Sequence, residues 1–81
     1  MRTFMVIERF RAGCLEAIYD RFESQGRLLP AGLHYVDSWL CREKEVCFQL
    51  MRTDDPDLFP IWFARWSDLV EFEINEIDSR P

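Results

Sequence analysis

Polar and aromatic side chains that alternate with apolar residues are the part of this 81-residue sequence best suited to bind a small molecule. We expect them on one open face of a sheet, with an arginine from a nearby loop: Tyr35, Asp37, Trp39, Gln49, Glu71, Glu73 and Arg27. The aromatic rings would form flat apolar walls, and Asp37 and Gln49 would orient a polar ligand. Glu71 or Glu73, if desolvated, could act as a general base. The alternative is that this face forms a polar subunit interface or contacts water.

Two arginines and the histidine limit the kinds of ligand, metal or cofactor site that the chain can form. Arg27 lies in a Gly- and Pro-containing segment, residues 26–33, where it could hold an anionic ligand. Arg65 lies in a helical pattern, residues 58–67, and is expected to pair with Asp68 or another neighbour. His34 is the only histidine, so a two-histidine metal site is excluded, and no motif supports haem ligation by it. We therefore predict no metal site and no cofactor.

Three cysteines, Cys14, Cys41 and Cys47, have no C-x-x-C spacing. An odd count without that spacing argues against a disulfide framework and against a zinc knuckle. Cys47 would need a base to become a nucleophilic thiolate, and His34 is expected on the other side of its strand. We predict free, non-catalytic thiols. Phosphate-binding glycine loops and G-x-S-x-G elbows are absent from the sequence.

Six segments must position these side chains. Strand patterns occupy residues 3–10, 33–41, 45–51 and 69–77, and helical patterns occupy residues 15–23 and 58–67. The order β-α-β-β-α-β is the ferredoxin-like arrangement. We expect one α+β domain over residues 1–81, in which two helices cover one face of a four-stranded antiparallel sheet ordered 4-1-3-2.

The loop between the second and third strands decides which residues face the helices. We expect a three-residue loop at residues 42–44, with Cys41 opposite Glu45. This register would place an almost purely apolar set under the helices: Val36, Leu40, Val46, Phe48 and Leu50. The odd-numbered residues of both strands would then lie on the open face, among them Tyr35, Trp39, Cys47 and Gln49.

Pro60 leaves two possibilities for the second helix. Regular helix begins near Leu58, or the helix kinks at Pro60, because an interior proline removes a hydrogen bond and crowds a carbonyl group. In both cases Leu58, Trp62 and Trp66 form an apolar stripe. Trp66 is therefore predicted to be a core residue and not a ligand-binding residue.

Charge and composition exclude several kinds of partner. The net charge is −5 and no basic stripe is present, so nucleic acid and anionic membranes are not expected partners. No apolar segment approaches the length of about 20 residues that spans a bilayer. Together with the free thiols this predicts a cytoplasmic protein. Aromatic residues make up 15% of so short a chain, and a second copy that covers part of them predicts a homodimer.

Five segments of the sequence together resemble a small bacterial family known as domain of unknown function 3303. These segments are Phe4-Met5-Val6-Ile7-Glu8, residues 26–33, Tyr35-Val36-Asp37-Ser38-Trp39, Cys47-Phe48-Gln49-Leu50-Met51, and Trp62 with residues 65–69. The resemblance covers nearly the whole chain. It implies a ferredoxin-like domain of the dimeric α+β barrel kind, and it implies no particular reaction.

Two functional hypotheses remain from the sequence. The first is a dimeric module that binds a small ligand or partner and has no chemistry of its own. The second is a cofactor-independent enzyme, monooxygenase-like or isomerase-like, that acts on a small aromatic or carbonyl compound. We favour the first because the sequence shows no nucleophile paired with a base.

Overall fold

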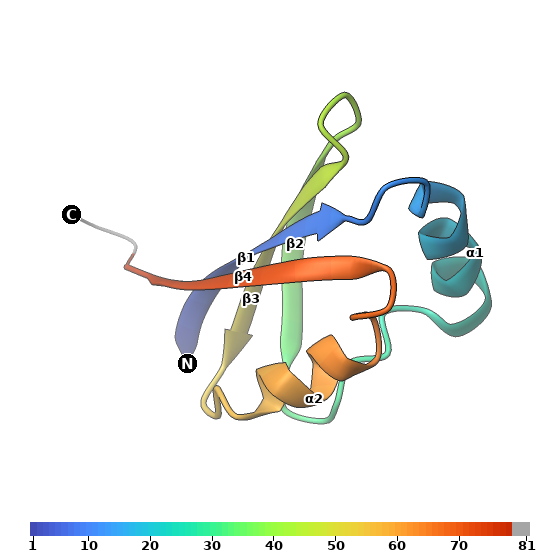
Figure 1. Cartoon of the computed structure of the whole chain (residues 1–81). Coiled ribbons are helices and arrows are strands. Elements are labelled where there is room, and N and C mark those ends of the chain that lie inside the picture. Colours follow the sequence, from blue (N-terminus) through green and yellow to red (C-terminus); the bar gives the residue numbers. More distant parts are fainter. Residues whose placement is uncertain (79–81) are drawn as a thin grey trace.

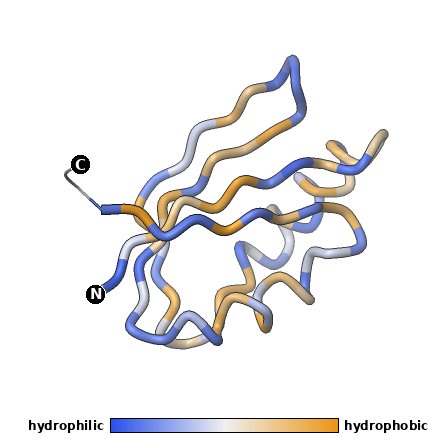
Figure 2. Tube along the Cα trace, turned by 60° about the vertical axis from the view of Figure 1, so that its left-hand side comes forward, coloured by the Kyte–Doolittle hydropathy of each residue, from blue (hydrophilic) through white to orange (hydrophobic). Residues whose placement is uncertain are grey.

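The computed structural model describes residues 1–78 and has the predicted order of elements (Figure 1). They are β1 (Arg2–Phe10), α1 (Leu15–Gln25), β2 (His34–Cys41), β3 (Val46–Thr53), α2 (Leu58–Ala64) and β4 (Val70–Ile77). The strands form one antiparallel sheet in the order β2-β3-β1-β4. Both helices lie on the same side of this sheet (Figure 2). The predicted ferredoxin-like fold and strand order are confirmed.

The central strand β1 sets the two faces of the sheet. Its even-numbered residues Phe4, Val6 and Glu8 are buried against the helices, whereas its odd-numbered residues lie on the open face. The core joins these strand residues to both helices: Phe4, Val6, Ile18, Leu33, Met51, Phe59, Trp62, Trp66 and Val70. The prediction that Trp66 is buried in the core is confirmed, since only 6% of its surface is exposed.

Helix α2 begins at Leu58, so Pro60 is its third residue. The first N–H groups of a helix have no acceptor within the helix, and a proline there removes no helical hydrogen bond. Of the two possibilities for this helix, the structure shows the first, in which regular helix begins at Leu58. The helix ends at Ala64, earlier than predicted, because the N–H groups of Arg65 and Trp66 bond three residues back, at 3.0 Å each. The end of α2 thus tightens into turns.

The predicted register of the β2–β3 hairpin is wrong by one residue. Cys41 pairs with Val46 and not with Glu45, and the turn contains four residues. Glu45 closes it with a φ of 52° and donates its N–H to Arg42 O at 3.2 Å. One extra residue exchanges the two faces of β3. Cys47, Gln49 and Met51 therefore face the helices, while Val46, Phe48 and Leu50 lie on the open face.

A β-bulge in β2 also places residues of that strand that were predicted to share one face on opposite faces of the sheet. Tyr35 pairs with Met51 and Asp37 pairs with Leu50, so Val36 is an additional residue on the β2 side. Tyr35 consequently lies on the helix side, where its hydroxyl is 2.7 Å from the Ser38 hydroxyl. Asp37 remains on the open face. Leu40 faces the helices as predicted, but Val36 does not and is 46% exposed.

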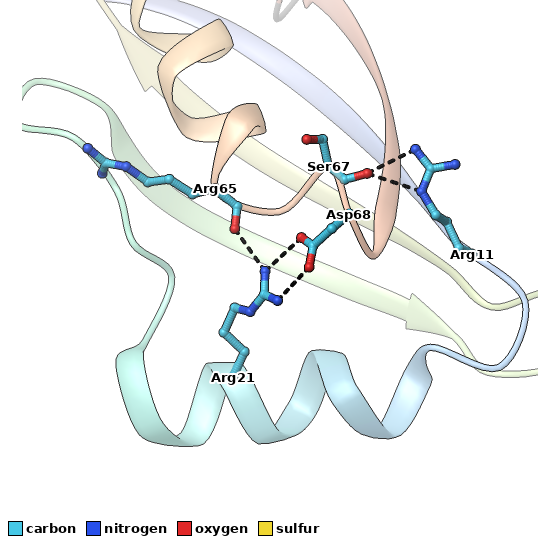
Figure 3. A network of polar contacts seen from close by, with 5 residues as sticks. All are labelled: Arg11, Arg21, Arg65, Ser67 and Asp68. Atoms are coloured by element: carbon cyan, nitrogen blue, oxygen red, sulfur yellow. Dashed lines mark hydrogen bonds and ion pairs between the residues drawn. The ribbon is translucent and has the colours of Figure 1, made fainter.

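Arginine side chains fasten the turn after α2 to neighbouring elements (Figure 3). Arg21 of α1 donates two hydrogen bonds to the Asp68 carboxylate, at 2.9 and 2.7 Å, and a third to Arg65 O. Arg11 donates to Ser67 O from the other side. Asp68, one of the expected partners of Arg65, therefore pairs with Arg21, and α1 is joined to the end of α2. Arg65 instead donates a hydrogen bond to another neighbour, Leu28 O, at 2.7 Å.

Candidate functional site

A cavity of about 250 Å³ lies between the two helices and the sheet. Its floor comes from β1, β2 and β3, and its walls come from the helices and the segment that follows α1. The lining residues are Glu8, Phe10, Ile18, Tyr19, Phe22, Arg27, Ser38, Leu40, Cys47, Gln49, Trp62, Trp66 and Val70. Most of these are aromatic or aliphatic, and a few polar groups converge among them, as in pockets for small molecules.

Strand pairing places three polar side chains together on the floor. Glu8 of β1 is directly opposite Cys47 of β3, and Val6, the preceding even-numbered residue of β1, is opposite Gln49. Side chains two residues apart on a strand share a face. Glu8, Cys47 and Gln49 therefore point to the helix side of the two central strands, in the middle of an otherwise apolar layer.

The Glu8 carboxyl group is strongly affected by this position. Its residue is only 8% exposed, and burial raises its pKa from 4.5 to about 7. Hydrogen bonding from Gln49 and Cys47 and the charge of Arg27 act in the opposite direction, but burial outweighs them. Glu8 therefore changes its protonation state near neutral pH, as general acids and bases often do.

Cys47 does not act as a nucleophile at neutral pH in this setting. Burial, followed by the nearby Glu8 carboxylate, raises the pKa of its thiol to about 12. A thiolate is the reactive form of cysteine, and the thiol stays protonated here. Cys14, Cys41 and Cys47 are all free, as predicted. In the described part of the chain, no three His, Cys, Asp or Glu side chains gather to hold a metal ion.

Arg27 is held at the cavity by both its backbone and its side chain. Its carbonyl oxygen accepts hydrogen bonds from the indole N–H groups of Trp62 and Trp66, each at 2.9 Å. Its guanidinium carbon lies 3.5 Å from the centre of the Tyr35 ring and 5.0 Å from that of Phe22. These cation–π contacts fix the group between two rings. Its buried Nε atom has no hydrogen-bond partner among residues 1–78.

Gln49 presents the complementary unpaired group. Its residue is 7% exposed, and its side chain hydrogen-bonds to Glu8. This bond lowers the pKa of Glu8 and so favours its ionised form, which can only accept, and the amide N–H₂ of Gln49 is therefore the donor to the Glu8 carboxylate. The buried Oε1 atom is then left without a partner in the described residues. An unsatisfied buried polar atom costs about 1–3 kcal/mol, so two of them around one cavity call for an explanation.

The predicted ligand-binding residues do not share one face. Gln49 and Arg27 line the cavity on the helix side, and Tyr35 supports Arg27 there. The remaining four lie on the opposite, open face: Asp37, Trp39, Glu71 and Glu73. The prediction of a common face is wrong because the hairpin turn and the bulge each add one residue to the expected register.

The two carboxylates predicted as possible bases are not desolvated. Glu73 pairs with Arg9 at 2.9 Å and Glu71 pairs with Arg11 at 3.1 Å, and all four side chains remain partly exposed. Hydrogen bonds from Asn75 and Arg9 hold the pKa of Glu73 below its usual value. A base that works near neutral pH needs a raised pKa, so Glu73 does not have the surroundings that this role requires. The side chain of Glu71 is 65% exposed and therefore is not desolvated.

Glu8 is the residue that sequence reasoning missed. A signal was present, because Phe4, Val6 and Phe10 follow the alternation of a core face and Glu8 occupies the remaining position. A charged residue at such a position is rarely buried without a function or a partner. Trp62 and Trp66 were expected only as core, and both also line the cavity.

Comparison with known proteins gives a family and a fold. A family model described as "Domain of unknown function (DUF3303)" matches residues 2–75. The chain is similar to protein Atu4242 from Agrobacterium tumefaciens, a solved structure, with a TM-score of 0.63 and 11% sequence identity. That alignment covers 96% of this chain and 92% of the other, and at this identity it shows the fold alone. No curated protein matches the chain. No helix among residues 1–78 is long and apolar enough to cross a membrane.

Proposed function

The chain belongs to the DUF3303 family, and we propose that it is a small-ligand-binding protein whose site is the cavity between the helices and the sheet. One observation carries this proposal. Arg27 Nε, a donor, and Gln49 Oε1, an acceptor, are both buried at the same apolar cavity without a partner among residues 1–78. A ligand that pairs with both atoms would remove the cost of burying them.

The positions of the tryptophans allow a direct test of this site. Trp62 and Trp66 line the cavity, and Trp39 lies on the opposite face and is 51% exposed. The three indole N–H groups give separate signals in ¹⁵N–¹H spectra. Titration with acetophenone, phenol and 3- and 4-hydroxyacetophenone should shift the signals of Trp62 and Trp66 and leave that of Trp39 in place.

A matched pair of variants controls for unspecific binding. Ser38→Phe places a ring in the cavity and should abolish the shifts, whereas Trp39→Leu alters only the open face and should retain them. Far-UV circular dichroism checks that both variants are folded. Shifts confined to Trp39, or no shifts with any of the four compounds, would contradict the proposed function.

The second candidate function is a cofactor-independent enzyme of the isomerase or monooxygenase kind. One feature favours it: the Glu8 carboxyl is nearly buried at the cavity and has a pKa of about 7, which suits proton transfer. Glu8→Gln keeps the shape and removes the titrating group. A protein that only binds would retain its affinity for acetophenone in this variant, because this probe has no hydroxyl group that could donate to Glu8. An enzyme would retain binding and lose turnover, once a substrate is found.

The open sheet face supports a homodimer as the functional form. Trp39 and Phe48 are paired across β2 and β3 on this face, and they are 51% and 37% exposed. Ion pairs of β1 with β4, such as Arg9–Glu73, border the apolar centre. A second copy of the chain would cover the rings and keep the charged border in water. The free thiols support a reducing compartment such as the bacterial cytoplasm.

A further inference from the structure

The polar groups of the cavity specify a class of ligand. We propose that the cavity binds an uncharged aromatic compound with a single ring that carries both a hydroxyl group and a carbonyl group. This inference rests on the proposed binding function and adds the chemistry of the ligand. Four features of the site lead to it: the volume of the cavity, its walls, its unpaired atoms and its charge.

Volume and walls indicate a single aromatic ring. A cavity of about 150 Å³ lined by apolar side chains is enough for benzene, and this one measures about 250 Å³. One ring with a few further atoms would therefore fill it. Tyr19 and Phe22 of α1, each 39% exposed, have ring surface that a ligand can reach, and the nearly buried Trp62 and Trp66 lie beside it. Aromatic rings stack favourably against such surfaces.

The floor requires a hydrogen-bond donor on the ligand. Gln49 Oε1 is an amide oxygen, so it can only accept a hydrogen bond, and it has no partner among residues 1–78. An ionised Glu8 carboxylate likewise accepts. A hydroxyl group supplies an O–H donor for these oxygens, and a bond from a hydroxyl to a carboxylate is among the stronger hydrogen bonds.

On the α1 side of the cavity, the ligand must provide a hydrogen-bond acceptor. Arg27 Nε can only donate, and its guanidinium group cannot turn away freely because it lies between Tyr35 and Phe22. A carbonyl oxygen matches this donor without adding charge. The backbone of Arg27 is fixed by Trp62 and Trp66, so the donor is held in place before the ligand binds.

Charge balance indicates that the ligand is neutral. Glu8 and Arg27 already interact as opposite charges across the cavity. While Glu8 is ionised, a cation or an anion would add one unpaired charge to a partly buried, mostly apolar space, which is costly. An amine or a carboxylate is therefore a poorer match than a hydroxyl or a ketone.

Calorimetric titration at pH 8, where Glu8 is ionised, tests the inference with named compounds. 3-Hydroxyacetophenone, which is still neutral at this pH, should bind at least about tenfold more tightly than acetophenone or phenol, because each of these leaves one buried protein atom unpaired. It should also bind more tightly than 4-hydroxybenzoate, which is an anion of similar size. 4-Hydroxyacetophenone is compared at pH 7, because its phenol group ionises near pH 8.

Two variants test which residue causes the preference for hydroxyacetophenone over acetophenone and which causes the preference over phenol. Gln49→Met removes the acceptor and should abolish the preference for hydroxyacetophenone over acetophenone. Arg27→Met keeps the length of the side chain, removes the donor, and should abolish the preference over phenol. Melting curves identify a variant that fails to fold, and the other variant then still tests its own half of the inference.

The outcomes separate this inference from the proposed function. Equal affinity for hydroxyacetophenones, acetophenone and phenol in the parent protein would overturn the ligand class and leave the binding function in place. Tighter binding of 4-hydroxybenzoate would overturn the neutrality of the ligand. Absence of binding by all the compounds, with unshifted Trp62 and Trp66 signals, would overturn both.

Discussion

At the scale of single residues, Glu8 makes the stability of the protein depend on pH. Its pKa is about 7 in the folded protein and near 4.5 when the chain is unfolded, so the folded state binds more protons between these values. Stability must then fall as pH rises from about 4.5 to about 7. A shift of this size corresponds to about 3 kcal/mol of unfolding free energy.

Glu8→Gln tests this dependence. The variant should be less sensitive to pH across that window and more stable than the parent at pH 8, because its amide does not have to be buried as a charge. Urea denaturation at pH 4.5 and pH 8 measures both. Glu73→Gln is the control: its carboxyl has a lowered pKa, so it loses a stabilising contribution that is present above about pH 4.5. Parallel pH profiles for parent and Glu8→Gln would contradict the burial of Glu8.

The hydrogen bonds of Trp66 can be separated from its packing. Trp66→Ala removes a nearly buried ring and should cost roughly 3–5 kcal/mol, enough to unfold a domain of this size. Trp66→Phe keeps a ring but removes the bond to Arg27 O, and should cost about 1 kcal/mol from that bond, with some further loss from the smaller ring. Thermal melts give both values. A cooperatively folded alanine variant that melts near the parental temperature would count against the core assignment.

The site was only partly predictable at this scale. Arg27, Tyr35 and Gln49 were expected at a ligand site, and the structure gathers them at one cavity. Glu8 was missed because its contribution comes from burial, which depends on how the helices cover the sheet. Residue type alone does not reveal a pKa near neutrality.

At the scale of elements, periodicity was enough to predict six elements in the correct order, but not the register of the hairpin. Val46, Phe48 and Leu50 are more apolar than Cys47, Gln49 and Met51, so the alternation favoured the wrong face. Apolar side chains that are exposed on the open face look like core residues in a single sequence. The register depends on the turn, where Glu45 adopts a left-handed conformation that residues other than glycine seldom take.

Glu45→Gly should therefore stabilise the hairpin. At a φ of 52° a side chain is strained and glycine is not, so the variant should gain about 0.5–1 kcal/mol, measured as a higher melting temperature. Glu43→Gly, in the same turn but without a positive φ, should be neutral or destabilising. If both variants melted alike, the strain at Glu45 would be negligible.

At the scale of the whole molecule, the proposed homodimer would form through the open face. Light scattering at micromolar concentration should give twice the chain mass for the parent protein. Trp39→Asp places a charge at the centre of the proposed contact and should yield a folded monomer, because an unpaired charge is costly in a buried interface. Asp37→Asn, on the same face, is the control and should remain dimeric. A parent protein that is monomeric at every accessible concentration would rule out the dimer.

The bulge at Val36 has a further consequence for how copies of this chain can meet. β2 is one border of the sheet, and its unpaired N–H and C=O groups could otherwise template another strand. The additional residue breaks the regular spacing of those groups, and the opposite border strand carries Glu71, Glu73 and Glu76. Stacking of sheets side by side into an open-ended fibre is thereby discouraged at both borders. The exposed rings of Trp39 and Phe48 can then promote a closed pair without also promoting aggregation.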